Sequence, residues 1–364
     1  MNYPFKNLVF EQGGTKGLAY LGAFEVLDEM EVTRQIERVG GSSFGAMYAL
    51  LIGLGYSTSE IKSLIRGLSF TSFMDKSWAS IFDVNSLVTE FGWYDGDFLR
   101  SWVANIIKQK TGNSEATFKE LHEQRDSKGF IDQYYISTNI STGHSELFSI
   151  EHTPRLPVAD AVRLTMSIPF IFAAKQNIRG DYYTDGALTG NSLVKVFDRE
   201  KYIAEEMRDR HMLRTDYYDT HNASLKSSGR EISPYVYNVE TLGFRLGTSK
   251  RVATFRDQSE YPNVRIDDFF GFTWSIIEMM IEGQSNYHIH NDDWHRTVFI
   301  DTMGVKSMQF DLDDRTADAL IASGKEYASR YFKWYNDAEY FAWNTDKLAG
   351  PLNKPSIDES EETE

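Results

Sequence analysis

The chain has 364 residues, a net charge of −15 at pH 7 and no cysteine. Its acidity excludes the basic face of a general nucleic-acid binder and broad adhesion to anionic membranes. Without cysteine, disulfides, thiolate catalysis and cysteine-ligated zinc are also excluded.

The N-terminal stretch MNYPFKNLVFEQGG lacks the basic and apolar regions of a secretory signal. No run in the chain reaches the roughly 18 apolar residues of a membrane-spanning helix. These features predict a cytoplasmic protein that is at most peripheral at membranes. Secretion through a system that reads other signals would leave no trace in the sequence.

The beginning of the chain alternates strand and helix patterns. Residues 7–10 (NLVF) form an apolar run before glycines, which predicts a buried parallel strand, and residues 15–30 carry apolar side chains at helical spacing. A second strand is expected at 36–39 and a buried helix at 44–54. Two successive strand–loop–helix units indicate an α/β fold with a parallel sheet.

The same mixture continues along the rest of the chain. Helices are expected at 59–67, 96–110, 157–166 and 316–335. Strands are expected at 135–138, 145–150, 182–184, 239–246 and 297–300, the first two forming a hairpin.

No Pro/Gly/Ser-rich linker interrupts the pattern, so we expect one domain over residues 1–345. A charged surface excursion is expected at about 197–231, and an acidic, disordered tail at 346–364. The aromatic stretches 69–93 and 269–283 are expected to pack in the core, with an acyl-chain wall, a lid or a membrane-touching face as alternatives.

Ser43 lies in Gly41-Ser42-Ser43-Phe44-Gly45, which contains the pattern Gly-x-Ser-x-Gly. A serine between glycines, after a strand and before a helix, sits on a sharp turn that lifts its hydroxyl out of the sheet. The helix N-terminus would favour developing negative charge there. A helix-capping loop without chemistry explains the same residues, so this motif alone leaves both interpretations open.

Gly13-Gly14-Thr15-Lys16-Gly17 also follows a strand and opens a helix. Consecutive glycines let backbone N–H groups converge on an anion, as in an oxyanion hole. A phosphate-binding P-loop is disfavoured, because Lys16 is followed by Gly17 instead of Ser or Thr. A plain tight turn remains the alternative. Lys16 would either attract an anionic head group or support the loop.

A serine hydroxyl needs a neighbouring base to become a good nucleophile. The chain has eight histidines, and none lies in a glycine-framed loop. Asp185, followed by Gly186, ends a short strand in an apolar, tyrosine-rich stretch. The alternative is an ordinary turn aspartate before glycine.

Taken together, these three motifs resemble those of patatin-like phospholipases. Residues 8–17 resemble the glycine-rich oxyanion motif of that family, residues 41–45 its nucleophile elbow, and Asp185-Gly186-Ala187 its Asp-Gly-Gly/Ala motif. The resemblance covers about residues 7–195, and more loosely extends to about 335. Further likeness appears in Gly55-Tyr56-Ser57, Gly92–Asp97, Ser167-Ile168-Pro169 and Asn191.

The resemblance implies a three-layer α/β/α sandwich with a mainly parallel central sheet. It implies a phospholipase A or lysophospholipase that cleaves phospholipid or other acyl-ester lipids with a Ser–Asp dyad, no metal and no cofactor, in transient contact with a membrane surface. Ser43 would be the nucleophile and Asp185 the base. Backbone N–H groups of Gly13, Gly14 and Thr15 would hold the oxyanion. The supporting motif positions would be Lys16, Gly17, Gly41, Gly45 and Gly186.

Two positions depart from the family pattern. Gln12 stands where a first glycine is usual and would be strained if its φ had to be positive. Phe44 follows the nucleophile where a small residue is common, and it would either narrow the acyl site or pack beneath the elbow. These departures leave room for a latent effector or binding protein that works only with a protein activator or a membrane.

A third alternative is an α/β-hydrolase esterase with a Ser–Asp–His triad of Ser43, Asp185 and either His288 or His290. Its elbow would normally follow several strands, whereas Ser43 follows only about two.

Overall fold

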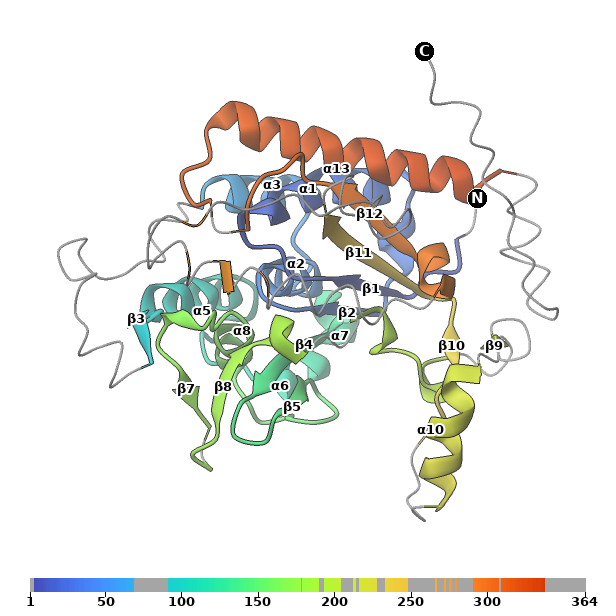
Figure 1. Cartoon of the computed structure of the whole chain (residues 1–364), viewed down its shortest axis with the longest axis horizontal. Coiled ribbons are helices and arrows are strands. Elements are labelled where there is room, and N and C mark those ends of the chain that lie inside the picture. The colour runs from blue at the N-terminus through green and yellow to red at the C-terminus, as the bar shows by residue number, and fades with distance from the viewer. Residues whose placement is uncertain are drawn as a thin grey trace.

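The computed structural model describes residues 3–68, 91–177, 179–189, 193–203, 212–213, 216–227, 233–247, 291–307 and 309–337, with five single positions between 248 and 290. A central eight-stranded sheet organises them in the order β12-β11-β1-β2-β4-β8-β7, with β5 paired to β4 (Figure 1). Its strands are β1 (Asn7–Phe10), β2 (Arg38–Gly41), β4 (Asp132–Asn139), β5 (His144–Phe148), β7 (Lys175–Gln176), β8 (Tyr182–Asp185), β11 (Thr241–Gly247) and β12 (Thr297–Asp301).

The strands from β12 to β4 run parallel to their neighbours, whereas β5 and β8 pair antiparallel with β4. The predicted α/β class, the parallel N-terminal strands and the β4–β5 hairpin are therefore confirmed. Phe10 of β1 pairs with Gly41 of β2, so these two strands end at the same level. Ligands bind at the carboxyl ends of parallel strands, and both glycine-framed motifs start there.

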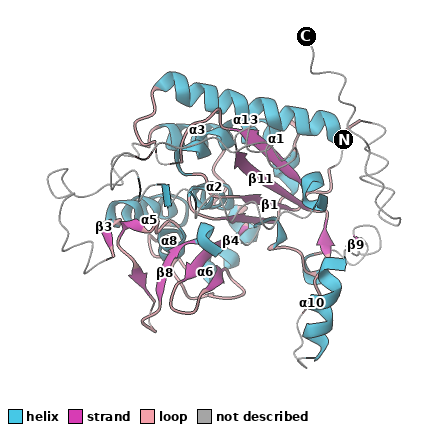
Figure 2. Ribbon diagram, viewed as in Figure 1, coloured by secondary structure: helices cyan, strands magenta, loops and turns pink. Residues whose placement is uncertain are grey.

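Helices flank the sheet (Figure 2). In the described ranges the α-helices are α1 (Ala19–Glu29), α2 (Phe44–Gly53), α3 (Thr58–Arg66), α5 (Asp97–Thr111), α6 (Phe118–Glu123), α7 (Arg125–Lys128), α8 (Val158–Thr165), α10 (Asp216–Ser227) and α13 (Asp314–Tyr335). Of these, α10 does not flank the sheet. Two small sheets pair β3 (Gly92–Tyr94) with β6 (Phe170–Phe172), and β9 (Met212–Leu213) with β10 (Tyr237–Asn238).

Alternation along β1 sends its side chains to two different cores. Leu8 and Phe10 belong to the larger core, where the Phe10 ring lies 5.3 Å from Tyr20 of α1 and 5.6 Å from Tyr48 of α2. Val9 faces the opposite side and packs in a smaller core with Val194 and others from the segment after Asp185. Both faces of the sheet are thus covered, as expected for a parallel sheet.

Helices α1 and α13 pack closely because each carries a glycine at the contact. A Cβ atom added to Gly22 would lie 1.9 Å from the carbonyl oxygen of Ile321, and one added to Gly324 would lie 1.8 Å from that of Ala19. Only glycine permits this approach. The long C-terminal helix is thereby fixed to the helix that follows the glycine-rich loop.

The segment predicted as a surface excursion is only partly exposed. Phe197 and Asp198 are fully buried, and the segment contains α10, which projects from the body at the end of the molecule opposite β3 and β7 (Figure 1). The tail at 346–364, nearly all of 69–93 and most of 269–283 lie outside the described residues. The single-domain organisation over 1–345 stays a prediction. No helix in the described ranges is both long and apolar enough to cross a bilayer.

His295 predicts a pH dependence of stability. Burial lowers its pKa from 6.5 to about 4, and its ring stacks on Trp334 at 5.7 Å. Below pH 6.5 His295 of the unfolded chain binds a proton, whereas His295 of the folded chain stays neutral until about pH 4. The contribution of this group to the free energy of unfolding is therefore complete above pH 6.5 and is lost as the pH falls from 6.5 to about 4.

Between pH 7 and pH 5 this group should lower the free energy of unfolding by about 2 kcal/mol. We expect His295→Phe to remove that part of the acid destabilisation in urea titrations at the two pH values. His144→Phe, at an exposed imidazole, is the control and should keep the slope of the unaltered chain. An identical pH dependence in all three proteins would contradict the assignment.

Candidate active site

Ser43 occupies a strained turn between β2 and α2. Its φ of 51° and ψ of −131° are rare for a residue with a side chain. The flanking glycines are required sterically, because a Cβ atom at Gly41 would lie 2.4 Å from the Gly45 carbonyl oxygen, and one at Gly45 would lie 2.1 Å from that of Phe10. This is the geometry of a nucleophile elbow, with the serine at a helix N-terminus.

The glycine-rich loop owes its shape to Gly14. Its φ is 55°, and a Cβ atom there would lie 1.9 Å from the carbonyl oxygen of Ser307. Thr15 anchors the loop, since its N–H donates to the same carbonyl at 2.9 Å and its hydroxyl donates to that of Lys306 at 3.1 Å.

The Thr15 N–H is therefore engaged in this structure, which leaves Gly13 and Gly14 as the candidate oxyanion donors. Within the ranges that the structure describes, the N–H groups of these two glycines have no acceptor. Such groups at the start of a helical turn can receive an anion.

The departures from the family pattern find structural explanations. Gln12 does not have a positive φ, so the special conformation rests on Gly14 and glutamine is unstrained. Phe44 is 2% exposed and packs in the core, with its ring 5.9 Å from that of Tyr48. A Cβ atom at Gly17 would lie 2.1 Å from Cδ1 of Phe44, so this ring fills the space between the elbow helix and the glycine-rich loop. Packing beneath the elbow is thus the favoured role of Phe44.

Lys16 is 5% exposed, which favours support of the loop over attraction of a head group. Glu11, just before the loop, is also largely removed from water. Burial raises the pKa of its carboxyl, and the Arg245 guanidinium, whose Nε lies 3.5 Å from Oε2, acts in the opposite direction. Tyr20 donates its hydroxyl to the Glu11 carbonyl at 2.9 Å, and burial raises its pKa well above 10, so it remains a donor.

The sheet register brings Asp185 toward Ser43. Gly41, the last residue of β2, pairs with Tyr135 of β4, and Ser43 follows in the turn after Gly41. Ser137 of β4 pairs with Asp185 of β8. Strands β2 and β8 thus lie on either side of β4, about 10 Å apart, because adjacent strands are about 4.8 Å apart.

A direct contact links the two turns as well. A Cβ atom at Gly186 would lie 2.8 Å from the Ser42 hydroxyl oxygen, so the Asp-Gly turn touches the elbow. Asp185 is fully buried. Its N–H donates to the Ser167 carbonyl at 2.9 Å, and its own carbonyl accepts from the Thr138 hydroxyl at 3.0 Å. The structure therefore gathers all three predicted motifs at one edge of the sheet.

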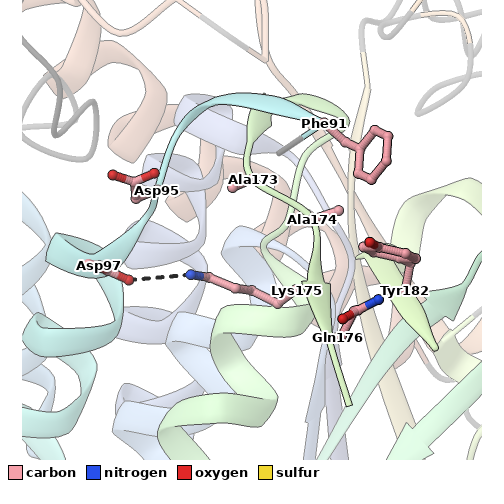
Figure 3. A pocket seen from close by; sticks show the side chains of 8 residues that line it. All are labelled: Phe91, Asp95, Asp97, Ala173, Ala174, Lys175, Gln176 and Tyr182. Carbon is pink, nitrogen blue, oxygen red and sulfur yellow. Dashed lines mark hydrogen bonds and ion pairs between the residues drawn. The ribbon is translucent and has the colours of Figure 1, made fainter. Parts of the chain in front are cut away.

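An open cavity of about 410 Å³ lies beside β7, the start of β8 and the turn between β3 and α5. Figure 3 shows the rings of Phe91 and Tyr182 on one side of it and Asp95 and Asp97 on the other, with the Lys175 ammonium 3.5 Å from the Asp97 carboxylate. The lining residues are Phe91, Asp95, Asp97, Ala173, Ala174, Lys175, Gln176 and Tyr182. Ser43 and Asp185 are not among them.

Sequence reasoning missed the residues that support the two turns. Thr165 accepts the Ser43 N–H at 3.2 Å, and Arg163 donates to the Ser167 hydroxyl at 2.6 Å. In the sequence, Ser167 stands out only as part of a Ser-Ile-Pro motif. His288 and His290, the bases of the triad alternative, lie outside the described residues.

The chemistry that this arrangement suits is acyl transfer to a serine. Such a reaction requires a nucleophile, a base and an anion site. The matching candidates are a hydroxyl at a helix N-terminus, a buried carboxylate on a strand next to β4, and two N–H groups without an acceptor in the described ranges.

Comparisons with known proteins agree with this picture. A family model described as patatin-like phospholipase matches residues 8–198. An uncharacterised protein of Acanthamoeba polyphaga mimivirus is 30% identical over 194 residues, which cover 53% of this chain and 61% of that protein. A probable lipid hydrolase of Invertebrate iridescent virus 6 is 25% identical over 193 residues, covering 53% and 63%.

The chain thus spans less than two thirds of the length of these two relatives. Among solved structures, VipD from Legionella pneumophila superposes with a TM-score of 0.54 at 15% identity, over 91% of this chain and 67% of VipD. At that identity the similarity concerns the fold alone.

Proposed function

Because the chain belongs to the patatin-like phospholipase family, we propose that it hydrolyses carboxylic esters of phospholipids, with Ser43 as nucleophile and Asp185 as base. One observation carries the proposal: the strained Ser43 elbow touches the turn that follows the buried Asp185, since a Cβ atom at Gly186 would lie 2.8 Å from the Ser42 hydroxyl oxygen. A turn serine and a turn aspartate without chemistry would have no reason to meet at this edge.

In the proposed reaction, Asp185 accepts the hydroxyl proton as Ser43 Oγ attacks the ester carbonyl carbon. The N–H groups of Gly13 and Gly14 stabilise the negative oxygen of the tetrahedral intermediate. The ester C–O bond then breaks, and the leaving lysophospholipid takes the proton from Asp185. Water, deprotonated by Asp185, attacks acyl-Ser43, and the serine regains its proton as the fatty acid leaves.

Vesicles of mixed phospholipids test this reaction. We expect mass spectrometry to detect free fatty acid and lysophospholipid in equal amounts at early times, without added metal or cofactor. The ratio of products from each lipid gives the preferred head group and acyl position. An absence of both products with every lipid would contradict the proposal for the isolated chain.

Exposed rings near the candidate site support transient contact with a lipid surface. Phe91 and Phe170 are 50% and 42% exposed, and each has a positive φ that ordinarily favours glycine or asparagine. Phe170 pairs with Gly92, the neighbour of Phe91, and lies three residues beyond Ser167, which holds Asp185. Strained backbone that presents rings to water is more typical of a functional surface than of a core.

Replacing both rings should weaken binding to phosphatidylcholine vesicles. We expect Phe91→Asn with Phe170→Asn to lower the partition coefficient by up to about tenfold per ring in a flotation assay. Full burial of a Phe side chain contributes about 1.5–3 kcal/mol, and only about half of each ring is still exposed. Asparagine suits the positive φ, so the fold should be kept. Hydrolysis of a water-soluble ester should be unchanged.

Ile140→Asn is the matched control, since Ile140 is 55% exposed on the β4–β5 turn. Equal vesicle binding by the double variant, the control and the unaltered chain would exclude these rings as the lipid-binding surface.

A further inference from the structure

The C-terminal end of α8 contacts both turns of the candidate site. Arg163 and Thr165 of α8, with Ser167 two residues beyond its end, make these contacts. We call these three residues the α8 ledge. Their exposed fractions are 2%, 0% and 1%. The proposed reaction assigns none of them a chemical step, and each contact described below is made inside the protein.

Thr165 joins the nucleophile turn to the sheet. Its hydroxyl oxygen accepts the Ser43 N–H at 3.2 Å, and the same hydroxyl donates to the carbonyl of Ile136 in β4. A hydroxyl is the smallest group that can do both at once. Without it, the Ser43 N–H would be a buried donor in need of a new acceptor, in a residue whose backbone is already strained.

Ser167 and Arg163 hold the base in a similar way. The Ser167 carbonyl accepts the Asp185 N–H at 2.9 Å and the Thr184 hydroxyl at 2.8 Å. Arg163 Nη1 donates to the Ser167 hydroxyl at 2.6 Å, and that hydroxyl donates back to the Arg163 carbonyl at 3.0 Å. Ser167 is therefore fixed through its side chain while its carbonyl fixes Asp185.

The guanidinium of Arg163 extends this support to the rim of the cavity. Its Nη2 donates to the carbonyls of Asp95 at 2.8 Å and Ala173 at 3.1 Å, two residues that line the cavity. A Cβ atom at Gly96 would lie 2.5 Å from Nε, so the fork packs directly against this turn. A lysine ammonium has no planar fork with which to satisfy the same three acceptors.

We propose that the α8 ledge sets the placement of the nucleophile relative to the base. Thr165 is the positioning residue for Ser43. Arg163 is the positioning residue for Asp185 and acts through Ser167. The inference rests on the proposed roles of Ser43 and Asp185. One short segment thus determines whether the Ser43 oxygen and the Asp185 carboxylate meet. Because reacting groups tolerate little misplacement, a ledge contact affects the chemical step and leaves lipid binding unchanged.

Thr165→Val tests the first contact, since valine keeps the shape and removes the hydroxyl. With phosphatidylcholine vesicles we expect kcat to fall about 100-fold while KM changes little, because misplacement by about 1 Å has an effect of this size. Thr165→Ser keeps the hydroxyl and should restore most of the rate. Thr297→Val is the control: it removes another buried hydroxyl, which donates to the Asp293 carbonyl at 2.7 Å, and kcat should not change.

Hydrogen exchange gives a second measurement that needs no turnover. The Ser43 amide should exchange slowly in the unaltered chain and in Thr165→Ser, and faster in Thr165→Val. Arg163→Lys should lower kcat about tenfold and speed exchange at the Asp185 amide, leaving Ser43 protected. This variant tests the inference even where Thr165→Val does not fold.

Unchanged kcat and unchanged exchange in Thr165→Val and Arg163→Lys would overturn the inference. A fall in kcat without faster exchange at either amide would overturn it too, because the loss would then have another cause. If the unaltered chain hydrolyses nothing but Thr165→Val exposes the Ser43 amide, the positioning contact stands and the proposed reaction fails.

Discussion

Ser43→Ala is expected to abolish fatty-acid release, with kcat reduced by about 10⁴-fold or more, since loss of a serine nucleophile removes the covalent route altogether. The measurement is fatty acid released from phosphatidylcholine vesicles, read by mass spectrometry. Alanine removes one buried oxygen and keeps Cβ, so we expect the urea midpoint of unfolding to stay close to that of the unaltered chain.

Ser42→Ala is the matched control for this change. Ser42 is 1% exposed, and within the described ranges its hydroxyl has no hydrogen-bond partner, so its loss should leave most of the activity. Full activity in Ser43→Ala would exclude Ser43 as the nucleophile. A fluorophosphonate adduct on Ser43 of the isolated chain would argue against a latent protein that requires an activator.

Asp185→Asn should reduce kcat about 10³- to 10⁴-fold, because an amide cannot accept the serine proton in the first step or the water proton in the second. Asparagine matches the volume of this buried side chain, so the change tests proton transfer more than packing. The rate of fluorophosphonate labelling should fall with kcat, since both depend on activation of the Ser43 hydroxyl.

Asp181→Asn, at the start of the same hairpin arm, is the control. Its carboxylate accepts only from Asn177 among the described contacts, and we expect unchanged turnover. If Asp185→Asn kept its activity and His288→Ala or His290→Ala lost it, the triad alternative would replace the Ser–Asp dyad.

The sequence was informative where glycines frame an unusual backbone conformation. The elbow around Ser43 and the loop at Gly14 need glycines where a Cβ atom would clash, so both can be recognised from their glycine-rich sequence. Asp185 was found for a related reason, since an aspartate that ends a strand before glycine leaves a short pattern. Long amphipathic helices such as α13 were also predicted from the sequence, and the predicted start of α13 differs from the observed one by two residues.

The supporting residues left no such signal. Thr165 and Arg163 look like ordinary helix residues, and their roles come from hydrogen bonds to segments 122 and 68 residues away in the chain. Helices α6 and α7 have 6 and 4 residues, too few for a periodic pattern to be recognised. The pairing of β3 with β6 is likewise set by tertiary packing between three-residue strands.

The anchor of the glycine-rich loop bears on where a functional fragment of this chain can end. Thr15 is tied to Ser307, 292 residues later, whereas the segment matched by the family model stops at residue 198. Strands β11 and β12, which continue the sheet beyond β1, also lie after that point. A shortened chain that keeps every proposed reacting group but ends at residue 198 would therefore lack the carbonyl that anchors the proposed oxyanion loop. We therefore expect the smallest functional fragment to extend at least to Ser307.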